Sequence, residues 1–183
     1  MKSLSMLVFA LLLSPVAFSQ SDRPKELTPA ILASIKSKAE TKSIKFKQSL
    51  DKEELTATEI NFSTDTFKVE EVARLRMDVD YSTSGMTNTV VDRASSYDKL
   101  LNKYYKLLLN ALKPADKNAL IAAQRSWITY RDAETKLIST MRKDIYSGGG
   151  TIQSNIASAA YADLVVQRTL AIFNYYNSIY SIK

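Results

Sequence analysis

The stretch Ala123–Glu134 carries the side chains of this chain best suited to a functional site. Gln124, Trp127 and Arg131 stand at i, i+3 and i+7, a spacing that places all three on one face of a helix. A large aromatic ring between an amide and a guanidinium on an inward face needs polar partners. Two roles fit: a buried polar network that fixes helix register, or a partner-binding site built on Trp127 and Arg131, because Trp and Arg are enriched at binding hot spots.

Partners for such a network are available on the neighbouring segments. Asp98 comes before the stretch and Arg168 after it, so two-pronged pairing of Asp98 with Arg131 or with Arg168 is open. The predicted structural network has six members: Asp98, Asn102, Gln124, Arg131, Asp132 and Arg168.

A second group of candidate binding residues is acidic: Glu70, Glu71, Asp78 and Asp80. Paired carboxylates serve glycoside chemistry, but nothing in the sequence places these four in a cleft, and a solvated helix face is the simpler interpretation. The chain has no His and no Cys, which excludes imidazole bases, thiol nucleophiles and the common structural zinc sites. We therefore predict a protein that is not an enzyme and that uses no cofactor and no metal.

The elements that must position these residues are helices. Apolar residues, Tyr97 and Tyr105 among them, step by three or four through Met86–Leu112, as in a long amphipathic helix. Pro114 ends this helix, and the next one runs to about residue 146. The glycines Gly148–Gly150 then separate it from a last helix. We predict an all-α fold, an antiparallel bundle of three long helices preceded by N-terminal helices.

The N-terminal region is predicted to be partly helical. Thr28 and Pro29 form a helix start signal, and the helix after them runs towards Leu50. Residues 55–62 alternate weakly between apolar and polar and are predicted to be a short extended piece. Ser63 or Asp65 then begins another helix that reaches residue 79.

The first residues have the three-part pattern of a secretory signal. Lys2 is followed by an apolar run over residues 4–13 and by the small-x-small cleavage site Ala17-Phe18-Ser19. The run is too short to span a bilayer, which takes about 20 residues, and no Cys follows it for lipid attachment. We predict export to the periplasm or medium, no lipoprotein anchor, and no later stretch long and apolar enough to cross a membrane. The predicted organisation is a signal peptide at 1–19, a helical or extended extension at 20–64 and the helical bundle at 65–183.

Positive charge is concentrated in the second half of the chain. Residues 96–183 hold 12 basic against 6 acidic side chains, net +6, whereas residues 21–95 hold 12 against 13. Nucleic acid is the usual partner of such a surface, but export argues against it. Anionic envelope polymers, lipid headgroups or an acidic protein remain as partners, beside a merely solvated positive face. The lysines of a continuous basic face would be Lys99, Lys103, Lys106, Lys113, Lys117 and Lys136.

Taken in order, these residues resemble the LprI-type lysozyme-inhibitor domain, a small exported helical domain of bacterial envelopes. The resemblance rests on Leu101–Tyr105, Gln124–Asp132, the Gly148–Gly150 turn and Arg168, and it covers roughly residues 83–173. It implies a binding protein that blocks a lysozyme-type muramidase by occupying its cleft. The alternative is a structural or assembly factor of the envelope that binds anionic polymer or lipid headgroups.

The resemblance also bears on the acidic residues. Host lysozymes are typically strongly basic, so an inhibitor gains association rate from an acidic surface. The matching half of this chain is basic, and the segment Asp65–Asp80 is the best acidic candidate.

The family usually carries cysteines that this chain lacks. Thr135 and Ala160 stand at two of those positions. The resemblance implies that they face each other across the glycine turn at a distance compatible with a disulfide. Loss of a bridge costs about 2–4 kcal/mol, which packing around Trp127 must offset.

Overall fold

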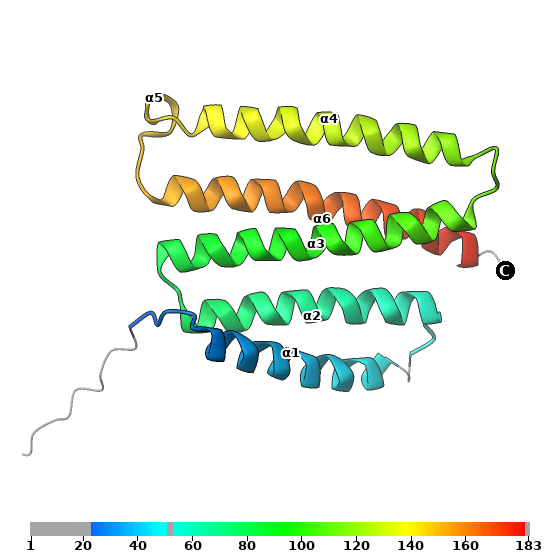
Figure 1. Cartoon of the computed structure of the whole chain (residues 1–183), viewed down its shortest axis with the longest axis horizontal. Helices are drawn as coiled ribbons and strands as arrows, with labels where there is room; N and C mark the ends of the chain where they lie inside the picture. Colours follow the sequence, from blue (N-terminus) through cyan, green and yellow to red (C-terminus); the bar gives the residue numbers. More distant parts are fainter. Residues whose placement is uncertain (1–22, 51–52, 182–183) are drawn as a thin grey trace, which may run out of the picture.

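The computed structural model describes residues 23–50 and 53–181, and these residues form helices and no strand (Figure 1). The helices are α1 (Pro29–Leu50), α2 (Ala57–Val79), α3 (Thr83–Ala111), α4 (Lys117–Met141), α5 (Asp144–Ser147) and α6 (Ile152–Ser181). The prediction of an all-α fold is confirmed. The predicted signal peptide at 1–19 lies outside the described residues.

The long helices lie side by side in the order α4, α6, α3, α2, α1 (Figure 1). The most extensive packing joins α3 to α6, and these two run in the same direction because α4 returns the chain between them. α4 packs on α6 and makes no comparable contact with α3. The three long helices α3, α4 and α6 alternate in direction along the chain, as the predicted antiparallel arrangement requires, and α6 lies between the other two (Figure 1).

Three aromatic rings from three helices form the centre of the core. Phe62 of α2 stacks on Phe173 of α6, with ring centroids 3.7 Å apart. Tyr104 of α3 meets both rings edge-on, at 5.0 and 5.4 Å. The buried cluster around them is completed by Leu101, Leu108, Leu120 and Ile172. Because Phe62 belongs to it, the N-terminal region is joined to the rest of the fold, and α4 contributes a single residue, Leu120.

The helix α6 is unusually apolar. By length and composition its segment Ile152–Tyr180 could cross a membrane, which corrects the prediction that no such stretch follows the signal. In this fold Val165, Thr169 and Ile172 are entirely buried, and Thr169 Oγ1 donates a hydrogen bond to the Tyr97 carbonyl of α3 at 3.3 Å. Part of the apolar character of α6 is thus used for packing against α3, whereas Ile156, Leu170 and Tyr175 are exposed.

The prediction of an extended piece at 55–62 is wrong, because α2 begins at Ala57. Thr56 Oγ1 accepts a hydrogen bond from the Glu59 N–H at 3.2 Å, and the Glu59 carboxylate accepts one from the Thr56 N–H at 2.8 Å. This capping box fixes the start of the helix and outweighs the weak alternation. α2 then continues without a break past the predicted boundary between residues 64 and 65.

The glycine turn follows a short extra helix. The helix predicted to reach residue 146 ends at Met141, and α5 fills the remaining distance. Gly148 ends α5 in the left-handed conformation, with φ of 74°, and its N–H donates to the Asp144 carbonyl at 2.9 Å. Glycine adopts this conformation without a Cβ clash, which explains the stop.

We expect Phe62→Ala to lower the free energy of unfolding by about 3–5 kcal/mol, because it leaves a cavity between Tyr104 and Phe173. Urea denaturation followed by circular dichroism measures the change. Ile145→Ala, at a side chain that is 81% exposed, is the control and should change it by less than about 0.5 kcal/mol. If Phe62→Ala lowered the free energy of unfolding as little as the control does, α2 would unfold independently of α3 and α6.

Candidate functional site

Trp127 lies half-buried on α4, at the contact between α4 and α6. The guanidinium carbon of Arg131, one turn further along α4, is 5.4 Å from the centroid of the Trp127 ring system. That of Arg168, from α6, is 5.8 Å away. Both distances are within the range of cation–π attraction, so two positive groups flank one aromatic ring.

Arg168 has one hydrogen-bond donor without an acceptor at this site. Its Nε donates to Gln124 Oε1 at 3.0 Å, whereas its Nη2 is buried and has no hydrogen-bond partner among the described residues. Burial lowers the pKa of Arg168, and the side chain nevertheless stays charged at neutral pH. A buried guanidinium N–H without an acceptor is costly, so an acceptor from another molecule would be bound favourably here.

A shallow groove of about 230 Å³ opens beside these residues. It is lined by Trp127, Tyr130, Leu164, Gln167, Arg168 and Ala171. Further large apolar side chains are exposed along α4 and α5: Ile128, Leu137, Met141, Ile145 and Tyr146. Exposed apolar groups gathered on neighbouring elements are typical of a surface that binds a partner.

The six residues predicted to form one network form three separate pairs. The pairs are Asp98 with Asn102, Arg131 with Asp132, and Gln124 with Arg168. The predicted pairing of Asp98 with Arg131 or Arg168 is not among the hydrogen bonds and ion pairs of the described residues. The helix order explains the missing Asp98–Arg131 pair, because α6 lies between α3, which carries Asp98, and α4, which carries Arg131 (Figure 1). Arg168 of α6 donates instead to Gln124 of α4.

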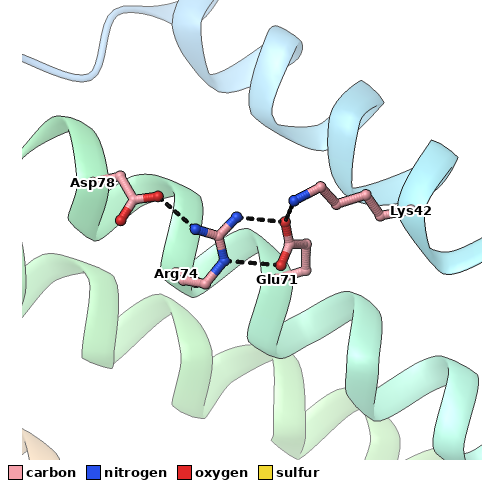
Figure 2. A network of polar contacts seen from close by, with 4 residues as sticks. All are labelled: Lys42, Glu71, Arg74 and Asp78. Atoms are coloured by element: carbon pink, nitrogen blue, oxygen red, sulfur yellow. Dashed lines mark hydrogen bonds and ion pairs between the residues drawn. The ribbon is translucent and has the colours of Figure 1, made fainter. Parts of the chain in front are cut away.

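Glu71 of the acidic group holds α1 against α2, as Figure 2 shows. Its carboxylate accepts hydrogen bonds from Arg74 Nη2 at 2.7 Å and from Lys42 Nζ of α1 at 2.6 Å. Arg74 also donates to Asp78, at 2.7 Å. Glu71 is only 8% exposed, and the bonds from Arg74 and Lys42 hold its pKa at about 2.

Glu70 and Asp80 are likewise bound within the chain. Arg93 Nη2 and the Tyr97 hydroxyl of α3 both donate to Glu70 at 2.7 Å. Burial raises the pKa of Glu70, but these bonds outweigh it and leave the pKa below its usual value. Asp80 accepts a 2.6 Å bond from the Ser82 hydroxyl in the turn before α3. All four acidic candidates therefore have partners inside the chain, and their role in binding stays a prediction.

The sequence reasoning missed Tyr104, which donates a bond of the same kind to α2. It placed Tyr105 on the inner stripe of α3, whereas Tyr104 is the fully buried residue and its hydroxyl donates to Asp65 at 2.8 Å. A buried Tyr hydroxyl needs an acceptor, so the acidic residues of α2 were a usable signal for the contact between α2 and α3.

Comparison with known proteins gives one match. The family model described as "Lysozyme inhibitor LprI" matches residues 77–171, from the end of α2 to within α6. No curated protein and no solved structure matches the chain. The matched range contains Trp127, Arg131 and Arg168, and it leaves out α1 and nearly all of α2.

We expect the double variant Thr135→Cys/Ala160→Cys to form a disulfide on oxidation, because the family cysteines imply that these half-buried positions face each other. The bridge would close a loop of 26 residues and stabilise the fold by about 3.5 kcal/mol. Thiol titration and thermal unfolding with and without reductant measure both effects. Lys136→Cys/Ala160→Cys is the control, since Lys136 is exposed. Equally fast oxidation of this control would contradict the predicted register of α4 on α6.

We expect Glu71→Gln to destabilise the protein at neutral pH and less so in acid. The folded-state pKa of about 2 lies below the ordinary value of 4.5, so the stabilisation is full above the ordinary value and disappears as the pH falls towards 2. Urea unfolding of both proteins from pH 7 to pH 2 should therefore give a narrowing difference. Glu54→Gln, at an exposed position, should match the parent throughout. If the difference in the free energy of unfolding between Glu71→Gln and the parent stayed constant with pH, ionisation of Glu71 would not be coupled to folding.

Proposed function

The chain belongs to the LprI lysozyme-inhibitor family, and from that premise we propose that it is an exported binding protein that blocks a lysozyme-type muramidase. Inhibition proceeds by steric occupation of the enzyme's cleft and involves no chemistry on the inhibitor. The signal-like pattern of residues 1–19 supports export to the periplasm or medium.

The observation that carries the proposal is the surface formed by α4 and α6. It combines a flanked aromatic ring, Trp127, with an exposed aromatic ring, Tyr130, and a buried guanidinium donor that lacks an acceptor, Arg168 Nη2. Aromatic and arginine side chains dominate the energy of protein interfaces. This surface lies within the range matched by the family model, whereas most of the acidic segment of α2 lies outside it.

Charge also favours this surface over the acidic one. Glu70, Glu71 and Asp78 are held in ion pairs within the chain, so they have little charge left to attract a basic enzyme. Glycoside hydrolases carry two carboxyl groups beside the scissile bond. A guanidinium presented to such a cleft binds a carboxylate in two-pronged geometry. This suits Arg168, which is in no ion pair among those of the described residues, better than Arg131, which already pairs with Asp132.

A second candidate function is an envelope structural or assembly role through the basic lysines. Lys99, Lys103 and Lys106 lie at helical spacing on α3, and Lys99 and Lys106 have no ion pair among those of the described residues. Lys136 lies on α4, across α6 from the others (Figure 1). The free α3 lysines support binding to anionic polymer or lipid headgroups.

We expect the chain from Gln20 to Lys183 to inhibit cell-wall lysis by at least one class of lysozyme, and Tyr130→Ala to weaken inhibition about thirtyfold. The factor corresponds to a hot-spot contribution of about 2 kcal/mol. Titration of lysozymes of several classes, read by turbidity at low and at physiological salt, measures it. Tyr81→Ala is the matched control, because Tyr81 is 46% and Tyr130 53% exposed.

Two results would contradict the proposal. If micromolar protein inhibited no class of lysozyme, the proposed inhibition would be excluded and the second candidate function would remain. Asp78→Asn could also weaken inhibition more than Tyr130→Ala does, with an effect that vanishes at physiological salt. That result would place the contact with the enzyme on α2.

A further inference from the structure

A pocket remote from Trp127 lies between α2 and α3. It has a volume of about 250 Å³ and is lined along one face of α3, from Thr89 to Lys99, and along α2 from Val69 to Arg76. Lys36 of α1 completes the lining. Because α1 and most of α2 lie outside the range matched by the family model, the pocket is built jointly by the matched domain and the N-terminal helices.

The lining is strongly basic: Lys36, Arg76, Arg93 and Lys99 accompany a single carboxylate, Asp92. Arg76 pairs with Asp92, and Arg93 pairs with Glu70, so both guanidiniums are held in position. The two lysines have no ion pair within the described part of the chain. Four cations thus face the carboxylates of Asp92 and Glu70, and that of Asp163 also acts on Arg93, so a positive surplus of one charge remains.

Two polar groups of the pocket are buried without a partner. Thr89 is 0% exposed, and its Oγ1 has no hydrogen-bond partner among the described residues. Arg76 Nε is in the same situation. The nearby Thr87 instead donates to the carbonyl one turn back, at 2.8 Å, as helical threonines commonly do. The unpaired hydroxyl of Thr89 therefore sets it apart, and such a group is costly to bury unless something in the pocket satisfies it.

We propose that this pocket binds the phosphate group of an anionic ligand. Thr89 Oγ1 and Arg76 Nε donate hydrogen bonds to its oxygens, and Lys36 and Lys99 supply the compensating charge. A phosphate offers several acceptor oxygens to this set of donors, and charge-assisted bonds of this kind are the strong ones. Water would satisfy the donors but would leave the positive surplus unused. The pocket is smaller than those that hold drug-sized ligands, which suits a single phosphate group.

The first test is stabilisation of the whole protein by phosphate. Thermal unfolding is recorded with inorganic phosphate from zero to 50 mM, with ionic strength held constant by sodium chloride (about 0.15 M, where exposed charges are screened). We expect the unfolding temperature to rise and to saturate with phosphate, because a ligand of the native state stabilises it by mass action. A rise no larger than that in chloride alone would overturn the proposal.

Two variants locate the binding. Thr89→Val keeps the shape and removes only the unpaired hydroxyl, so without phosphate its stability should equal or exceed that of the parent. We expect Thr89→Val and Lys99→Gln each to weaken phosphate binding about tenfold, as measured by isothermal titration calorimetry. Lys106→Gln removes the same charge from α3 outside the pocket lining and should leave the affinity unchanged. Equal affinity in the parent, Thr89→Val and Lys99→Gln would place any phosphate elsewhere and overturn the proposal.

A phosphodiester probe distinguishes the sources of the phosphate group. Glycerophosphoglycerol is titrated beside inorganic phosphate, and binding of either that is weakened by Thr89→Val supports the site. Tighter binding of the diester identifies a headgroup or polymer unit as the ligand, whereas tighter binding of inorganic phosphate identifies the free ion. Thr89→Val should leave lysozyme inhibition unchanged, so the two sites are tested independently.

Discussion

The parallel packing of α6 against α3 determines where every other helix can lie. Two helices that run in the same direction cannot be joined by a tight turn, so the chain between them must travel back along their full length, and α4 is that return. Val165, Thr169 and Ile172 of α6 are fully buried by the fold, which contains no disulfide because the chain has no cysteine. Packing alone must therefore hold the long helices together.

The other side of α3 is held differently, by polar bonds that run along an antiparallel contact. Asp65 meets Tyr104 and Glu70 meets Tyr97, while Arg76 pairs with Asp92 further along. Each step towards the end of α2 is matched by a step towards the start of α3. These bonds desolvate carboxylates only where a hydroxyl or guanidinium compensates them. The acidic residues of α2 thus act as connectors between helices, which is why so little of their charge faces outward.

The sequence predicted the features that depend on local spacing. It failed for contacts that depend on residues far apart in the chain. The stripe of α3, the glycine stop at Gly148 and the start of α1 follow from periodicity and turn chemistry. The start of α2 is predictable from the capping box of Thr56 and Glu59, whereas the weak alternation over residues 55–62 points to an extended piece that does not form. The pairing of Asp98 with Arg131 assumed that α3 and α4 are neighbours, and no local pattern reveals that α6 comes between them. The unpaired donors Thr89 Oγ1 and Arg76 Nε depend on three helices at once and leave no sequence signal.

α4 carries Gln124, Trp127 and Arg131, yet among the described residues it supplies only Leu120 to the buried core. Substitutions along its outer face change what the surface presents at little cost in folding free energy, since exposed positions far from the core are nearly neutral. The residues that make this chain fold and those of the proposed contact surface are thereby largely separated on different helices. Under the proposed function, such a division would allow the contact surface to change with an evolving target while the packing of α2, α3 and α6 stays as it is.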